Sequence, residues 1–278
     1  MKRWVLIALV LIVIFPLSGM TKKSSMPNIA PRPTQVPDSS FADKFWQQAE
    51  KEIYKPVISL QFQQYKERNQ NIFYTKLMRG DPEDKKIALT FDDGPHPKFT
   101  PQILAVLKKY HIKATFFVVG RLAEQYPDLI KSEAAAGNLV GNHTYDHVML
   151  TKLTAENVQL EWQTCSNVLK SIIGKPTHFC RPPGGDYNHT VITAAMKQRL
   201  TTVLWTDDPG DYASPGDSVI LDRTLGRVEN GGIILLHDGV QQTIDVLPQI
   251  IQTLQKRGYK FVRVDEMVQD KSSLTSHF

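Results

Sequence analysis

Cysteine is one of the scarcest residues in this 278-residue sequence. The two cysteines, Cys165 and Cys180, are too few for a fold held together by disulfides. The two thiols could pair if the protein is exported, because an oxidising environment permits disulfides. Two free, buried thiols are an equally good interpretation, so the cysteines exclude a disulfide scaffold and leave their own pairing open.

An excess of charge of one sign is also missing. The chain has 33 Lys and Arg residues against 28 Asp and Glu, a net charge of +5, and no dense basic patch. Nucleic acid is therefore not an expected partner. With 41% hydrophobic and 22% charged residues the composition is that of an ordinary globular protein, which argues against disorder and multiple membrane spans. The length allows one large α/β domain with extensions, or two small domains.

The one long apolar run is at the start of the chain, where residues 4–15 follow Lys2 and Arg3. The run is shorter than the roughly 20 apolar residues of a transmembrane helix, and a charged segment followed by an apolar one is typical of an export signal. We therefore expect residues 1–20 to be a signal peptide and the protein to be secreted or associated with the cell envelope. No clean A-x-A cleavage site follows, so an uncleaved anchor, with membrane attachment only through residues 4–17, is the alternative.

Two further segments precede the main domain. Residues 21–39 contain four prolines among Ser, Thr and Lys, which predicts an extended tether. Residues 40–54 have apolar side chains at helical spacing and are predicted to form an amphipathic helix that could pack on the main domain; they are Phe41, Phe45, Trp46, Ala49 and Ile53. This helix opens a helical N-terminal extension, residues 40–84, in which residues 55–84 have no clear pattern.

From residue 86 onward, short apolar strands alternate with amphipathic helices. This alternation predicts a parallel sheet, open or closed into a barrel, in one α/β domain at residues 85–270, followed by a tail at residues 271–278. Polar residues gather just after the strands, at the edge where parallel sheets assemble their sites. The strands are predicted at residues 87–91, 114–119, 178–181, 202–205, 232–236 and 259–264, and helices begin near residues 100, 127, 154 and 247.

Asp92 and Asp93 are adjacent carboxylates at the end of the first of these strands. Two neighbouring carboxylates repel each other, and such a pair is most often a solvated loop. Here a strand buried on both faces leads directly into them, which favours a functional role. If a cation is present, one carboxylate can bind it while the other stays free as a base.

His143 and His147 are four residues apart, the spacing of one helical turn, which would let both imidazoles point at one ion. Two histidines at this spacing on a surface helix are more often bystanders. With Asp93 they form a set of two histidines and one carboxylate. Such sets hold catalytic zinc with an open position, and they also hold non-haem iron in oxygenases.

Two later strands also end in polar residues. Arg181 follows one of them and could pair with a catalytic carboxylate, while the glycines after it would let backbone N–H groups approach a ligand closely. His237 ends the other strand, where an imidazole with a pKa near neutrality could act as a general acid. Asp211 offers a carboxylate that could orient such a histidine.

These segments resemble the five motifs of the polysaccharide deacetylases with a NodB homology domain, carbohydrate esterase family 4. The resemblance covers roughly residues 85–270, and the motifs follow the family's order: Thr90-Phe91-Asp92-Asp93-Gly94-Pro95, His143-Thr144-x-x-His147, Arg181-Pro182-Pro183, Asp208-x-x-Asp211 and Leu235-x-His237. It implies a distorted (β/α)7-type barrel of parallel strands. It also implies a hydrolase that removes acetyl groups from a polysaccharide.

The resemblance implies one divalent metal ion, most often zinc, bound by Asp93, His143 and His147. Asp92 would be the general base, held by Arg181. The implied substrates are N-acetylated amino sugars of peptidoglycan or a chitin-like polymer, acted on by a monomer.

The resemblance also implies that His237 is the general acid, held by Asp211. The backbone N–H of Gly184 would stabilise the oxyanion, and Tyr212 and Leu235 would wall the pocket for the acetyl methyl. Two residues depart from the family's pattern: Gly184 stands where Tyr is common, and Tyr212 where Trp is common. Neither departure removes a titrating or metal-binding group, so substrate preference is less certain than the reaction.

Three alternatives are open at this point. The substrate could be an O-acetylated polysaccharide. The domain could be a non-catalytic glycan-binding module, which would require a missing catalytic or metal-binding residue, and none is missing. A two-histidine-one-carboxylate iron oxygenase would give no role to Asp92 or His237 and would need oxygen.

Overall fold

The structure, a computed structural model, describes residues 39–49 and 53–268. The predicted signal at residues 1–20, nearly all of the tether at residues 21–39 and the tail at residues 271–278 lie outside these residues. Among the described residues, no helix is both long and apolar enough to cross a membrane.

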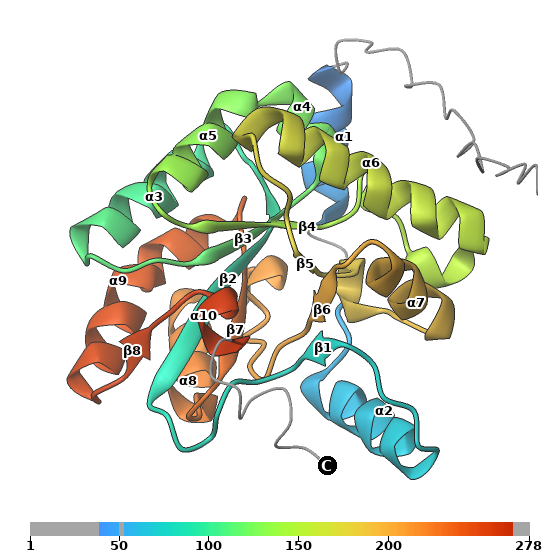
Figure 1. Cartoon of the computed structure of the whole chain (residues 1–278). Coiled ribbons are helices and arrows are strands. Elements are labelled where there is room, and N and C mark those ends of the chain that lie inside the picture. Colours follow the sequence, from blue (N-terminus) through green and yellow to red (C-terminus); the bar gives the residue numbers. More distant parts are fainter. Residues whose placement is uncertain (1–38, 50–52, 269–278) are drawn as a thin grey trace, which may run out of the picture. The chain divides into compact units, whose positions relative to one another are not determined.

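A curled sheet of parallel strands forms the centre of the domain (Figure 1). The strand order is β1-β6-β5-β4-β3-β2-β7, and β8 pairs with β2. Beyond β6, Asp207 forms a parallel bridge to Ile234, which links the segment after β6 to the edge strand β7. The predicted parallel α/β fold is therefore confirmed. The strands are β1 (Lys76–Leu77), β2 (Lys86–Gly94), β3 (Thr115–Val118), β4 (Leu139–Asn142), β5 (Phe179–Cys180), β6 (Thr201–Val203), β7 (Ile233–His237) and β8 (Lys260–Phe261).

Helices surround the strands, as Figure 1 shows. They are α1 (Ser39–Ala49), α2 (Val57–Asn69), α3 (Phe99–Lys109), α4 (Gly120–Gln125), α5 (Pro127–Ala135), α6 (Ala155–Ile173), α7 (His189–Lys197), α8 (Asp217–Arg227), α9 (Gln241–Lys256) and α10 (Val264–Val268), with single 3₁₀ turns at Leu150–Lys152, Pro183–Gly185 and Asp211–Ala213. The sequence determines some of their ends locally. Thr154 accepts a hydrogen bond from the Asn157 N–H at the start of α6, and Gly174 ends this helix in the left-handed conformation.

Both faces of the central strands are buried. In β7, Ile233 and Leu235 belong to one apolar cluster, while Ile234 and Leu236 belong to a second cluster under α3 and α9. This division follows from the alternation of side chains along a strand. It confirms the prediction of strands covered on both sides, and it leaves the strand ends as the place for polar residues.

The predicted helix at residues 40–54 is shorter than its apolar spacing suggested. Helix α1 is Ser39–Ala49, and Ile53–Pro56 is not helical. Ile53 is 86% exposed, so it does not continue the apolar face. One physical reason is Pro56, which disfavours helical backbone at the residue before it. The packing of this helix on the main domain is confirmed, because Phe45 is buried in a cluster with Val119 and Leu122.

The two cysteines are free and buried. Cys165 belongs to the apolar cluster under α3 and α9, whereas Cys180 belongs to the cluster that contains Ile233 and Leu235. Burial raises the pKa of both thiols, that of Cys180 to about 12. The interpretation of two free, buried thiols is the one that agrees with the structure.

Candidate active site

Asp92 and Asp93 approach the same histidine although they are neighbours on β2. Successive side chains of a regular strand point to opposite faces, so adjacent carboxylates would normally diverge. The register between β2 and β3 shifts after Phe91, and Asp93 has a left-handed φ of 70°. This bulge redirects one carboxylate. His143 Nε2 consequently lies 3.7 Å from Asp92 Oδ2 and 3.3 Å from Asp93 Oδ1.

The two histidines lie on a loop after β4, so the prediction that they share a helical turn is wrong. Thr144 has a φ of 67° and His147 a φ of 53°, left-handed values that interrupt a helix. Side chains hold the loop in place. Asn142 Oδ1 accepts a hydrogen bond from the Thr144 N–H at 2.8 Å, and Glu161 Oε2 accepts one from the Asp146 N–H at 2.9 Å. The loop nevertheless brings both imidazoles to Asp93.

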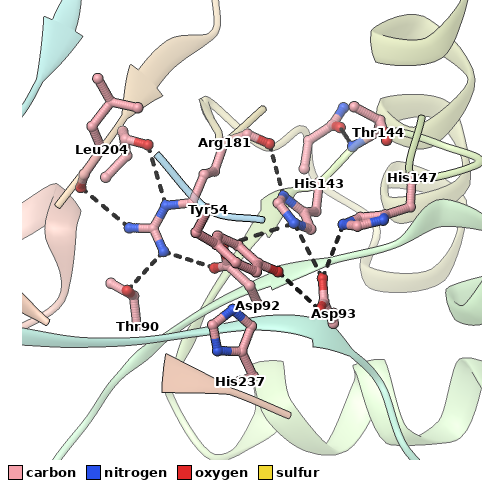
Figure 2. Close-up of polar contacts among 12 residues, drawn as sticks. Tyr54, Thr90, Asp92, Asp93, His143, Thr144, His147, Arg181, Leu204 and His237 are labelled. Atoms are coloured by element: carbon pink, nitrogen blue, oxygen red, sulfur yellow. Dashed lines mark hydrogen bonds and ion pairs between the residues drawn. The ribbon is translucent and has the colours of Figure 1, made fainter. Parts of the chain in front are cut away.

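Asp93, His143 and His147 form one group of candidate metal ligands, with their ligand atoms within 4.8 Å of one another (Figure 2). His147 Nε2 lies 3.1 Å from Asp93 Oδ1. His143 Nδ1 lies 2.8 Å from the carbonyl oxygen of Arg181. Because a carbonyl only accepts, Nδ1 carries the proton and Nε2 presents its lone pair to the group.

The group fits a divalent cation. Among the described residues, the buried atoms His143 Nε2 and Asp93 Oδ1 have no hydrogen-bond partner. Buried polar atoms without a partner are rare, and a metal ion satisfies them. Two imidazoles and one carboxylate are the donor set that holds catalytic zinc with an open position.

Arg181 fixes the other carboxylate. Its guanidinium is fully buried and donates to Asp92 Oδ1 at 2.7 Å and to Thr90 Oγ1 at 2.8 Å. It also donates to the carbonyl oxygens of Val203 and Leu204, at 3.2 and 3.3 Å. Burial lowers the pKa of Arg181, and the charge of Asp92 opposes that effect. One oxygen of Asp92 is thus held by the arginine, and the other faces His143.

His237 lies directly opposite Asp92 in the pairing of β2 with β7. Its Nδ1 lies 2.7 Å from Asp211 Oδ1, and Asp211 Oδ2 accepts hydrogen bonds from the His237 N–H and from Thr243 Oγ1. Burial alone would lower the pKa of His237. Asp211, with contributions from Asp93 and Asp92, outweighs burial and raises it to about 10. These carboxylates favour the protonated imidazole, in which Nε2 is the second donor.

Comparisons with known proteins agree with this geometry. Residues 79–203 match the family model described as polysaccharide deacetylase. A peptidoglycan-N-acetylglucosamine deacetylase of Bacillus cereus is 37% identical over 193 residues, which cover 68% of this chain and 90% of that protein. The chain belongs to the polysaccharide deacetylase family.

Two further similarities extend this result. The peptidoglycan-N-acetylmuramic acid deacetylase PdaC of Bacillus subtilis is 36% identical over 191 residues, which cover 69% of this chain and 40% of that protein. The solved structure of the Bc1960 peptidoglycan N-acetylglucosamine deacetylase matches with a TM-score of 0.68 and 34% identity, over 70% of this chain and 92% of that one. The predicted family, fold and enzyme class are therefore confirmed.

The three residues predicted to bind the substrate come from three different elements. The ring of Tyr212 lies 5.3 Å from the ring of His237, measured between centroids. Leu235 is fully buried in β7, two residues before His237. Gly184 lies in the turn after β5 with a φ of 61°, which favours glycine, and its carbonyl oxygen accepts a hydrogen bond from the Lys55 N–H at 2.9 Å.

No role was predicted for three residues that contact the deacetylase site, although Thr90 stands in the first motif. Thr90 and Thr243 support Arg181 and Asp211 through their hydroxyl groups. Tyr54, in the N-terminal extension, donates a hydrogen bond from its hydroxyl group to Asp93 Oδ2 at 3.2 Å. A residue 39 positions away from its partner has no local pattern that could have identified it.

Proposed function

We propose that this polysaccharide deacetylase is a metal-dependent enzyme of the cell envelope that hydrolyses the N-acetyl groups of amino sugars in peptidoglycan. One observation supports the proposal best. The candidate ligand group of Asp93, His143 and His147 lies beside Asp92, and His237 is the cross-strand partner of Asp92. A Lewis-acid site and two groups for proton transfer are therefore side by side, the combination that amide hydrolysis needs.

Zinc is the ion we propose for the ligand group, because two imidazoles and one carboxylate suit it. A divalent ion bound there would polarise the acetamide carbonyl and lower the pKa of a bound water toward about 7. The proton on His143 Nδ1, held by the Arg181 carbonyl, keeps Nε2 available as a ligand.

Asp92 is the proposed general base. Arg181 holds its Oδ1 at 2.7 Å, which leaves Oδ2 to take a proton from the attacking water. The guanidinium and the carboxylate form an ion pair in which both side chains are fully buried, so each charge compensates the other.

His237 is the proposed general acid. Asp211 engages its Nδ1, so the proton on Nε2 can be given to the departing sugar nitrogen. The backbone N–H of Gly184 is proposed to stabilise the oxyanion, and Tyr212 with Leu235 to wall the pocket for the acetyl methyl. The products are acetate and a free amino sugar.

Peptidoglycan is the proposed polymer because two similar relatives are named for it, one for N-acetylglucosamine and one for N-acetylmuramic acid. Another relative, 37% identical over 193 residues, is a chitooligosaccharide deacetylase of Rhizobium leguminosarum. Because this polymer lies outside the cell membrane, we propose that residues 1–20 direct export and that residues 21–39 form a tether. We also propose that the enzyme acts as a monomer.

The test is acetate release from purified peptidoglycan, N-acetylglucosamine oligomers and acetylxylan, each with zinc-loaded and chelator-treated protein. We expect release from peptidoglycan that falls at least about 100-fold after metal removal and returns with zinc. Release from acetylxylan alone, or release that survives complete metal removal, would contradict the proposal.

A further inference from the structure

The side chains that must meet the substrate are closed off in this conformation. Asp92 and His143 are 0% exposed, and Asp93 and His237 are 2% exposed. A hydrolase acting on a polymer has to bring the acetamide group of a sugar against these atoms. Part of the protein therefore covers the site and has to move before the substrate can enter.

Tyr54 covers the side of the site that includes His237. Its ring lies 4.6 Å from the ring of His237 and 4.5 Å from the ring of Tyr212, measured between centroids. Its hydroxyl group donates to Asp93 Oδ2, and the side chain is only 3% exposed. Figure 2 shows the phenol in front of Asp92, with its oxygen directed at Asp93. Tyr54 thus occupies the space between the proposed acid, the proposed pocket wall and a metal ligand.

Tyr54 belongs to the non-helical segment Ile53–Pro56, here called the strap. Besides Tyr54, Lys55 holds the strap in place. Its N–H donates to the Gly184 carbonyl at 2.9 Å, and its Nζ pairs with Asp186 at 2.7 Å and donates to Gln63 Oε1 at 3.5 Å. The ion pair is partly exposed, and such pairs contribute little to stability. Helix α2, which follows, is anchored more firmly, with Leu60 fully buried and Glu67 paired with Lys76.

We propose that the strap closes the active site of the substrate-free protein, with the phenol of Tyr54 in the pocket for the acetamide group. This inference rests on the proposed function, which identifies that pocket. The substrate and the phenol cannot share one volume, so the polysaccharide has to displace Tyr54. When a ligand binds only the open form, its apparent affinity is its intrinsic affinity multiplied by the fraction of protein that is open. Short acetylated sugars, with few contacts outside the pocket, are affected most.

The test compares Tyr54→Ala with Tyr54→Phe and with Tyr65→Ala, a matched control on the exposed side of α2. The measured quantity is kcat/KM for a trimer of N-acetylglucosamine with zinc-loaded protein. We expect Tyr54→Ala to raise kcat/KM at least about fivefold, because opening no longer limits binding. Tyr54→Phe keeps the covering ring and should give a smaller rise, and Tyr65→Ala should leave the value unchanged. Unchanged or reduced kcat/KM in Tyr54→Ala overturns the proposal, since it would make Tyr54 a bystander or a positioning residue.

A second measurement does not depend on activity. It is the rate at which an excess of EDTA removes zinc from each protein. Tyr54→Ala should release zinc several-fold faster than wild type, and Tyr54→Phe more slowly than Tyr54→Ala, because the ring restricts access. Equal acceleration in Tyr54→Phe and Tyr54→Ala would assign the effect to the lost hydrogen bond with Asp93 and would overturn the strap. If none of the proteins releases acetate but the expected order of zinc release holds, the proposed function fails and the strap stands.

Discussion

Replacement of Asp92 by Asn is expected to lower the rate of acetate release by about 10³-fold or more, while the protein still binds its metal ion. Asn has nearly the same shape and can still accept the hydrogen bond from Arg181 at Oδ1, where the carboxylate now accepts at 2.7 Å. It cannot take a proton from the attacking water. The proposed metal ligands Asp93, His143 and His147 are unchanged, so the variant should separate the proposed base from the proposed metal site.

The measurement is acetate release from peptidoglycan together with zinc content for each protein. Asp146→Asn is a suitable control because this carboxylate lies on the same loop as the histidines and pairs with the half-buried side chain of Arg121. We expect that control to retain its rate within about threefold, since surface pairs contribute little. Wild-type rates in Asp92→Asn would show that Asp92 is not the base.

Arg181→Met is expected to have the largest effect on stability. Arg181 and Asp92 are both fully buried, and removal of one partner leaves the other charge uncompensated in the interior. Breaking a buried ion pair in this way typically costs about 3–5 kcal/mol of unfolding free energy. The substitution also leaves the carbonyls of Val203 and Leu204 without the guanidinium donors that they accept from.

The check is urea unfolding of metal-free protein, with the double variant Arg181→Met/Asp92→Asn as the comparison. Because the double variant removes both charges, its free energy of unfolding should be at least about 1 kcal/mol higher than that of Arg181→Met alone. If Arg181→Met lowers the free energy of unfolding by less than about 1 kcal/mol, the buried ion pair is not required for stability. A double variant that is less stable than Arg181→Met alone would also contradict this account.

Much of the fold and the candidate site could be predicted because their signals are local. The apolar run of β2 leads directly into Asp92 and Asp93, and the same pattern places His237 at the end of β7. Parallel strands gather such residues at one edge, so residues distant in sequence could be expected in one place. The resemblance to a known family then supplied the roles that the residue types alone left open.

What could not be predicted depends on backbone detail and on distant contacts. The spacing of His143 and His147 suggested a helical turn, but left-handed residues and hydrogen bonds from Asn142 and Glu161 make a loop. The apolar spacing of α1 continued to Ile53, whereas the helix ends at Ala49. The position of Tyr54 in the active site follows from tertiary packing alone.

We propose that one divalent ion is bound by Asp93, His143 and His147, with Asp92 unligated beside it. The most direct test is the zinc content of purified, zinc-reconstituted and dialysed protein, measured for wild type, Asp93→Ala, His143→Ala, His147→Ala and Asp92→Asn. We predict about one zinc ion per chain in wild type and Asp92→Asn, and a large loss in each of the three ligand variants. Retention of a full zinc ion in all three ligand variants, or its loss in Asp92→Asn alone, would contradict the account.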